Sequence, residues 1–199
     1  MATKYDKTGK LAVADAALTL FAEKGILATT TRDIATKAGV AEGTIYRHYA
    51  DKDTLAAELF RQCLVRLNEY LRGKLQQQKS VVGKFRVLVQ SFFDFAQEQP
   101  ASYSYIMLGH YTQFKGLPPG TPMPRDVFVE LIRDGMEKGI LQHRDEFLSA
   151  AMFIGALERV IFFKNHGLIQ EEYSQIIPQV AEACLRMLST EDIWAAECC

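Results

Sequence analysis

The chain has 199 residues, of which 48% are apolar and 24% are charged, a composition that is typical of a globular protein and excludes disorder and collagen. The 23 Lys and Arg residues nearly balance the 24 Asp and Glu residues, which gives a formal net charge of −1. This balance excludes a general attraction to nucleic acid or to an anionic membrane, so any such contact must come from a local patch.

The first part of the chain predicts short helices. Apolar residues recur at spacings of three and four, and Val, Ile and Thr do not alternate as in strands, so we expect an all-α protein of about nine helices. A first helix is expected over residues 8–24, ending at Gly25. Thr30 and Asp33 form a capping box that begins a second helix, 31–38, which stops at Gly39. A third short helix is expected over residues 42–48.

Longer helices are expected beyond Asp51, which caps a fourth helix that runs from residue 52 to about 78. An aromatic helix over 81–97 and a short segment over 101–113 follow, and then a loop over 115–124 that holds four of the six prolines. The remaining helices are expected over about 124–138, 144–164 and 172–189. Pro178 either kinks the last of them or marks its start.

The two short helices around Gly39 match a helix-turn-helix in spacing. Gly39 supplies the positive φ that such a turn needs. The outward face of the second helix is polar and carries Thr44, Tyr46 and Arg47, all of which can donate to phosphate oxygens. On these residues alone, a plain helical corner with a solvated polar face stays open as the alternative.

Residues 29–55, TTTRDIATKAGVAEGTIYRHYADKDTL, closely resemble the DNA-binding signature of TetR-family transcriptional regulators. With the first helix at the right distance upstream, the resemblance covers about a quarter of the chain and includes the Ala38-Gly39-Val40 turn. It implies an N-terminal three-helix helix-turn-helix DNA-binding domain over residues 1–54, followed by a helical effector-binding and dimerisation domain over 55–199.

The resemblance also implies a set of DNA contacts. Arginine can bridge guanine O6 and N7, and a glutamate can accept from cytosine N4, which agrees with base readout by Arg47 and Glu42, although Arg47 equally suits phosphate. Ala41 departs from the Ser often found at its position, which removes a cap oxygen usually worth about 1 kcal/mol. The implied phosphate contacts are Thr30, Thr44, Tyr46, His48 and Lys52, and the residues at or near base edges are Arg32, Glu42, Gly43 and Arg47.

A module of this size reads few bases, so useful specificity requires a homodimer on a palindromic operator in double-stranded DNA. The last two helices carry apolar stripes that suit a four-helix bundle between two chains, as the resemblance implies; a purely internal core is the alternative. The candidate interface residues are Ala150, Ile154, Leu157, Ile161, Ile177, Val180, Ala181, Cys184 and Leu188.

The aromatic density between Phe85 and Phe114 suits a pocket for a small, largely apolar effector. Buried Tyr and His need partners that a ligand can supply, although satisfied core groups are the alternative for each of them. Arg159 suits an acidic ligand or, equally, Glu158 of a neighbouring chain. The candidate pocket residues are Tyr103, Tyr105, Met107, His110, Tyr111, Met152, Arg159 and Phe163.

The sequence therefore predicts a ligand-responsive, sequence-specific repressor that a small effector releases from its operator. A helical small-molecule-binding protein or enzyme with a scaffold-only N-terminus, or a DNA-bound architectural factor on the same fold, is the alternative. No catalytic or metal-ligand arrangement stands out, so we expect no enzyme, metal or cofactor. The cysteines lack disulfide or zinc spacing, and a signal peptide and a membrane span are not indicated, so we expect a cytoplasmic protein.

Overall fold

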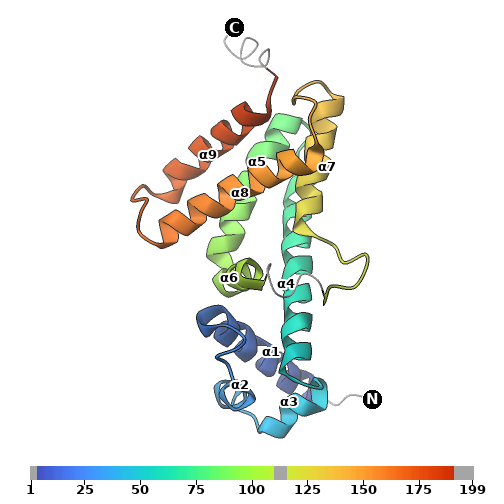
Figure 1. Cartoon of the computed structure of the whole chain (residues 1–199), viewed down its shortest axis with the longest axis vertical. Helices are drawn as coiled ribbons and strands as arrows, with labels where there is room; N and C mark the ends of the chain where they lie inside the picture. The colour runs from blue at the N-terminus through green and yellow to red at the C-terminus, as the bar shows by residue number, and fades with distance from the viewer. Residues whose placement is uncertain (1–3, 110–115, 191–199) are drawn as a thin grey trace. The chain divides into compact units, whose positions relative to one another are not determined.

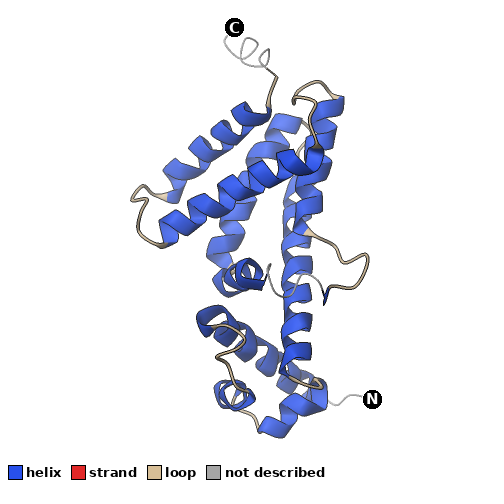
Figure 2. Ribbon diagram, viewed as in Figure 1, coloured by secondary structure: helices blue, strands red, loops and turns tan. Residues whose placement is uncertain are grey.

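The computed structural model describes residues 4–109 and 116–190, and within them the chain forms nine α-helices and no strand (Figures 1 and 2). The all-α prediction is confirmed, and the predicted helices appear in the predicted order. A single isolated bridge pairs Leu141 with Ser189 in the described part. The helices are α1 (Lys4–Lys24), α2 (Thr31–Ala38), α3 (Glu42–His48), α4 (Lys52–Leu75), α5 (Val81–Glu98), α6 (Pro100–Gly109), α7 (Pro124–Glu137), α8 (Glu146–Asn165) and α9 (Tyr173–Leu188).

The chain divides into two compact units. The first comprises Met1–Arg66 and Gln99–Thr121, and the second comprises Leu67–Glu98 and Pro122–Cys199. Within the described residues the first unit therefore holds α1, α2, α3, the beginning of α4, and α6. This division differs from the expected boundary between residues 54 and 55, which stays a prediction about where the DNA-binding function ends.

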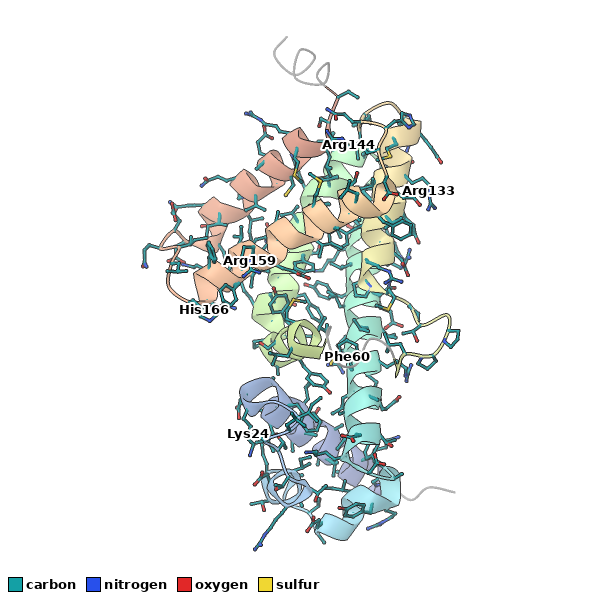
Figure 3. The ribbon with its side chains drawn as sticks, in the orientation of Figure 1. Lys24, Phe60, Arg133, Arg144, Arg159 and His166 are labelled. Atoms are coloured by element: carbon teal, nitrogen blue, oxygen red, sulfur yellow. The ribbon has the colours of Figure 1, made fainter. Side chains whose placement is uncertain are left out.

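The core of the first unit is built around α1, which packs against α2, α3 and α6. Tyr105 of α6 stacks on Phe21 of α1 with ring centroids 5.7 Å apart, and it meets Phe60 of α4 edge to face. A Cβ added at Gly109 would lie 2.5 Å from the Phe60 ring, so α6 approaches this ring closely only because residue 109 is glycine (Figure 3 labels Phe60).

The core of the second unit is aromatic. Phe85 of α5 stacks on Phe153 of α8 with centroids 4.2 Å apart, and Phe128 of α7 meets Phe153 edge to face. On α5 the side chains of Phe85, Leu88, Val89 and Phe92 are buried in this core. Helix α9 begins at Tyr173 and contains Pro178. Pro178 therefore lies inside the last helix and does not mark its start.

Candidate functional site

The N-terminus of α2 carries the expected capping box. The Thr30 hydroxyl accepts from the backbone N–H of Asp33 at 3.1 Å, and the Asp33 carboxylate accepts from the backbone N–H of Thr30 at 3.0 Å. The Lys24 ammonium donates to the same carboxylate at 2.8 Å (Figure 3 labels Lys24). These hydrogen bonds, led by that from Lys24, lower the pKa of the Asp33 carboxyl to about 2. Lys24 therefore ties the end of α1 to the start of α2.

The turn between α2 and α3 depends on Gly39, which has φ +66°. Its N–H donates to the carbonyls of Ala35 and Thr36 and so ends α2, as the sequence predicts. Ala41 is the N-cap of α3 and makes no side-chain cap bond. Ile45 of α3 is fully buried and fixes this helix on the rest of the first unit.

The outward face of α3 is polar and linked to α2. The Thr31 hydroxyl donates to Glu42 Oε1, and the Tyr46 hydroxyl donates to Thr31 Oγ1 at 3.4 Å. The Arg47 guanidinium donates to Thr44 Oγ1 at 3.5 Å. Sequence reasoning missed Thr31, because nothing in the pattern shows that its hydroxyl meets Glu42.

Most of the expected DNA contacts reach the surface of the first unit. His48 and Thr44 are half-buried, and Lys52 is described separately below. The open space around the Cα of Gly43 leaves its backbone accessible. The exposed members of the set are Thr30, Arg32, Glu42, Gly43, Tyr46 and Arg47.

Lys52 has a role that its sequence position does not reveal. Its ammonium donates to the carbonyl of Ile26 at 2.8 Å and to that of Thr29 at 2.7 Å, so it holds the loop between α1 and α2. Two of the three N–H donors of this ammonium therefore serve the protein, and the contact of Lys52 with phosphate stays a prediction.

The expected effector-pocket residues divide between the two units. Tyr103, Tyr105 and Met107 belong to the first unit, and the three on α8 belong to the second. Tyr105 is buried and its hydroxyl donates to the carbonyl of Ala56 at 2.8 Å, so this hydroxyl has a protein partner, and the place of Tyr105 in an effector pocket stays a prediction. The two remaining members, His110 and Tyr111, lie outside the described residues.

On α8 the expected pocket residues lie on the outer side of the helix. Phe163 and Arg159 are exposed and Met152 is half-buried. The Arg159 guanidinium lies over the Phe162 ring, 5.0 Å from its centroid (Figure 3 labels Arg159). Burial raises the pKa of the neighbouring Glu158 carboxyl, and Arg159 offsets part of that rise.

A polar cavity of about 420 Å³ lies in the second unit, and none of the expected pocket residues lines it. In the lining of this cavity Arg72 and Glu130 form a bidentate ion pair, with both N–O distances 2.7 Å. The Lys84 ammonium lies 3.6 Å from Asp134 Oδ2. The charged side chains of this lining therefore already form ion pairs with one another.

The apolar stripes expected to form a dimer interface lie mostly inside the single chain. Ile154 and Val180 are half-buried and the other seven are buried in the second unit, because α8 packs on α5, α7 and α9. The expected interface face is therefore wrong for these seven residues. They are Ala150, Leu157, Ile161, Ile177, Ala181, Cys184 and Leu188.

Residues 4–109 and 116–190 offer neither a membrane-spanning helix nor a cluster of metal ligands. None of their helices combines the length and the apolar character that crossing a membrane requires. No group of three or more His, Cys, Asp or Glu side chains in this part of the chain is arranged to hold a metal ion.

Comparison with known proteins adds to this geometry. Over 80 residues the chain is 40% identical to the HTH-type transcriptional repressor KstR2 of Rhodococcus jostii (strain RHA1), covering 40% of this chain and 32% of that protein. Over 128 residues it is 27% identical to KstR2 of Mycobacterium tuberculosis (strain H37Rv), covering 62% of this chain and 64% of that protein. The matched part of the chain thus spans about a third of the length of the first of these curated relatives and about two thirds of the length of the second.

A solved structure shares the fold. A TetR family transcription regulator from Marinobacter aquaeolei VT8 superposes with a TM-score of 0.81 at 16% identity, covering 94% of this chain and 99% of that one. The short α2 and α3 around Gly39 define a helix-turn-helix protein. Residues 13–59 match the family model described as bacterial regulatory proteins, tetR family. The N-terminal part of the chain is therefore similar to TetR-family regulators.

Proposed function

We propose that this protein is a ligand-responsive transcriptional regulator, a repressor rather than an enzyme, that binds a palindromic operator as a homodimer. The observation that carries the proposal is the polar outward face of α3, held at a fixed angle by the Gly39 turn and by the Thr31–Glu42 hydrogen bond. The KstR2 relatives, which are named as repressors, support the same reading.

In this proposal α3 enters the major groove and α2 lies across the backbone. Phosphate contacts and base-edge contacts then have different consequences, because the former set affinity and the latter set sequence preference. The proposed phosphate contacts are Thr30, Thr44, Tyr46, His48 and Lys52, and the proposed base-edge residues are Arg32, Glu42, Gly43 and Arg47.

The proposed dimer uses a face of α8 that differs from the buried stripe. Phe147, Ala151, Gly155 and Phe162 recur at helical spacing and are all exposed. The small residues at 151 and 155 permit close approach of a second helix, and the flanking rings supply apolar area. A second copy of this chain is the occupant that a two-fold operator requires.

The dimer proposal has a matched test, because Gly73 and Gly155 are both exposed helix glycines with open space around an added Cβ. Gly155→Arg places a charge on the proposed interface, and Gly73→Arg places the same charge on α4. Sedimentation should find a monomer for Gly155→Arg and a dimer for Gly73→Arg. Dimers for both variants would move the interface elsewhere.

The proposed effector acts by linkage. A small, largely apolar molecule in the second unit releases DNA only to the extent that it prefers a conformer that binds the operator less well. Helix α4 is the proposed connection, because it begins at Lys52 and continues past the unit boundary at Arg66 to Leu75.

DNA binding itself is tested by fluorescence anisotropy with a labelled random-sequence duplex at several salt concentrations. Arg47→Met should weaken binding, and the slope of log K against log salt should fall by about 0.9 if this residue contacts phosphate. Arg86 is an exposed arginine on α5 and gives the matched control, Arg86→Met. If Arg47→Met and Arg86→Met both bind like the unmodified protein, the outward face of α3 is not the DNA interface.

A further inference from the structure

A second cavity lies in the first unit, where none of the expected DNA contacts lines it. Its volume is about 470 Å³, within the range of small-molecule sites. The end of α1, the loop that follows it, the start of α4 and the end of α6 form its walls. The lining residues are Phe21, Lys24, Gly25, Ile26, Leu27, Ala28, Asp53, Tyr105, Leu108 and Gly109.

The lining is apolar, and most of its polar groups already have partners. The Lys24 ammonium is held by Asp33, and the Tyr105 hydroxyl donates to Ala56. Asp53 is exposed to water, where a charge interaction is weakened by solvent. Among the described residues of this lining no cation is left to hold an anionic group, so their chemistry suits a neutral apolar molecule.

Two large apolar side chains at this cavity face water. Leu27 is 97% exposed and Leu108 is 56% exposed. Removing such side chains from water is favourable, and a bound apolar molecule would do so. The buried Phe21 and Tyr105 rings, which stack on each other, also belong to the apolar lining.

The cavity wall is the same loop that positions the proposed DNA contacts. The buried Thr29 hydroxyl donates to the carbonyl of Gly25 at 2.8 Å, and Lys52 donates to the carbonyls of Ile26 and Thr29. Thr30, the next residue, caps α2. A displacement of the loop at Ile26 therefore reaches Lys52 and Thr29 through hydrogen bonds, and it reaches Thr30 as the next residue in the chain.

We propose that this cavity binds a neutral, largely apolar small molecule, and that its occupancy lowers DNA affinity by moving the α1–α2 loop. The cavity lies in the first unit and contains Tyr105 of the effector-pocket residues that the sequence predicts, whereas the effector proposed above binds in the second unit. The binding step stands alone, whereas the regulatory step rests on the proposed DNA binding.

The binding step is tested by photolabelling the full chain with an aryl trifluoromethyl diazirine, with N-phenyl-1-naphthylamine as the neutral competitor. Trypsin cleavage after Lys24 and Arg32 releases peptide 25–32, which contains the loop. Competitor at about ten times its Kd should lower labelling of this peptide about tenfold. Labelling that excess competitor does not lower would overturn the site.

Variants locate the competitor. Leu108→Glu puts a charge in the cavity and Ala28→Trp fills it, so both should abolish the protection of peptide 25–32. Leu168 is 67% exposed and belongs to the second unit, so Leu168→Glu is the matched control and should keep the protection. Circular dichroism identifies any variant that fails to fold, and Ala28→Trp then replaces Leu108→Glu. Protection that persists in a folded cavity variant would contradict the proposal.

The regulatory step is tested with the same competitor and a labelled random-sequence duplex. N-phenyl-1-naphthylamine should lower the DNA affinity of the unmodified protein and of Leu168→Glu, and should leave that of Leu108→Glu unchanged. Equal responses of the two variants would refute regulation through this cavity. Protein that shows competitor-sensitive labelling but binds no DNA would keep the ligand site and reject the proposed function, so the two failures are distinguishable.

Discussion

The missing cap of α3 gives a prediction with a defined size. Ala41 has the extended φ and ψ of an N-cap, −69° and 144°, but it has no side-chain oxygen to accept from the first turn. Ala41→Ser supplies that oxygen in a backbone conformation that already suits it. Such a cap is worth about 1 kcal/mol, so the equilibrium for opening α3 should shift about fivefold toward the closed helix.

Hydrogen exchange measures this effect directly at the amides of Gly43 and Thr44, the second and third residues of α3. Their protection should rise about fivefold in Ala41→Ser. Ala57→Ser is the matched control, because Ala57 is an exposed alanine inside α4 where serine caps nothing. Unchanged protection in Ala41→Ser, or an equal rise in Ala57→Ser, would refute the capping argument.

Three further changes have directions that the structure fixes. Because the pKa of the Asp33 carboxyl is lowered in the folded chain, its interaction with Lys24 stabilises the fold above pH 3.8, and this stabilisation is lost as pH falls through about 2. The free energy of unfolding of Asp33→Asn should therefore depend less on pH across this window than that of the unmodified protein. Gly109→Ala should lower the free energy of unfolding by about 1–3 kcal/mol in a denaturant titration, because the added Cβ overlaps the buried Phe60 ring; no change would mean that the ring moves freely. Phe153→Ala should cost about 3–5 kcal/mol in the same assay, because its ring is fully buried and stacked, and a loss below 1 kcal/mol would contradict this core.

Local signals made the helix-turn-helix predictable. The capping box of Thr30 and Asp33 and the positive φ of Gly39 both act within a few residues, so the pattern alone located α2 and α3. The absent cap at Ala41 could be read in the same way, because it depends on one side chain.

Features that depend on distant contacts were not predictable in this way. Helix α8 is apolar around much of its circumference, so periodicity cannot tell which side meets the core, and Leu157 and Ile161 lie in the core of the chain rather than on an outer face. Helix α4 runs without a break in pattern across the unit boundary at Arg66, so composition could not mark that boundary. The Lys52 ammonium suits a phosphate and a carbonyl equally, and only folding brings the carbonyl of Ile26 to it.

Selection of bound duplexes from a random-sequence DNA pool tests most directly the claim that two α3 helices read an operator. At near-physiological salt the unmodified protein should enrich an inverted repeat, with half-site centres about 34–36 Å apart or somewhat more. Arg47→Ala should enrich a repeat that is altered at the positions Arg47 contacts. If the folded protein enriches no inverted repeat, the claim that this chain reads a palindromic operator is contradicted.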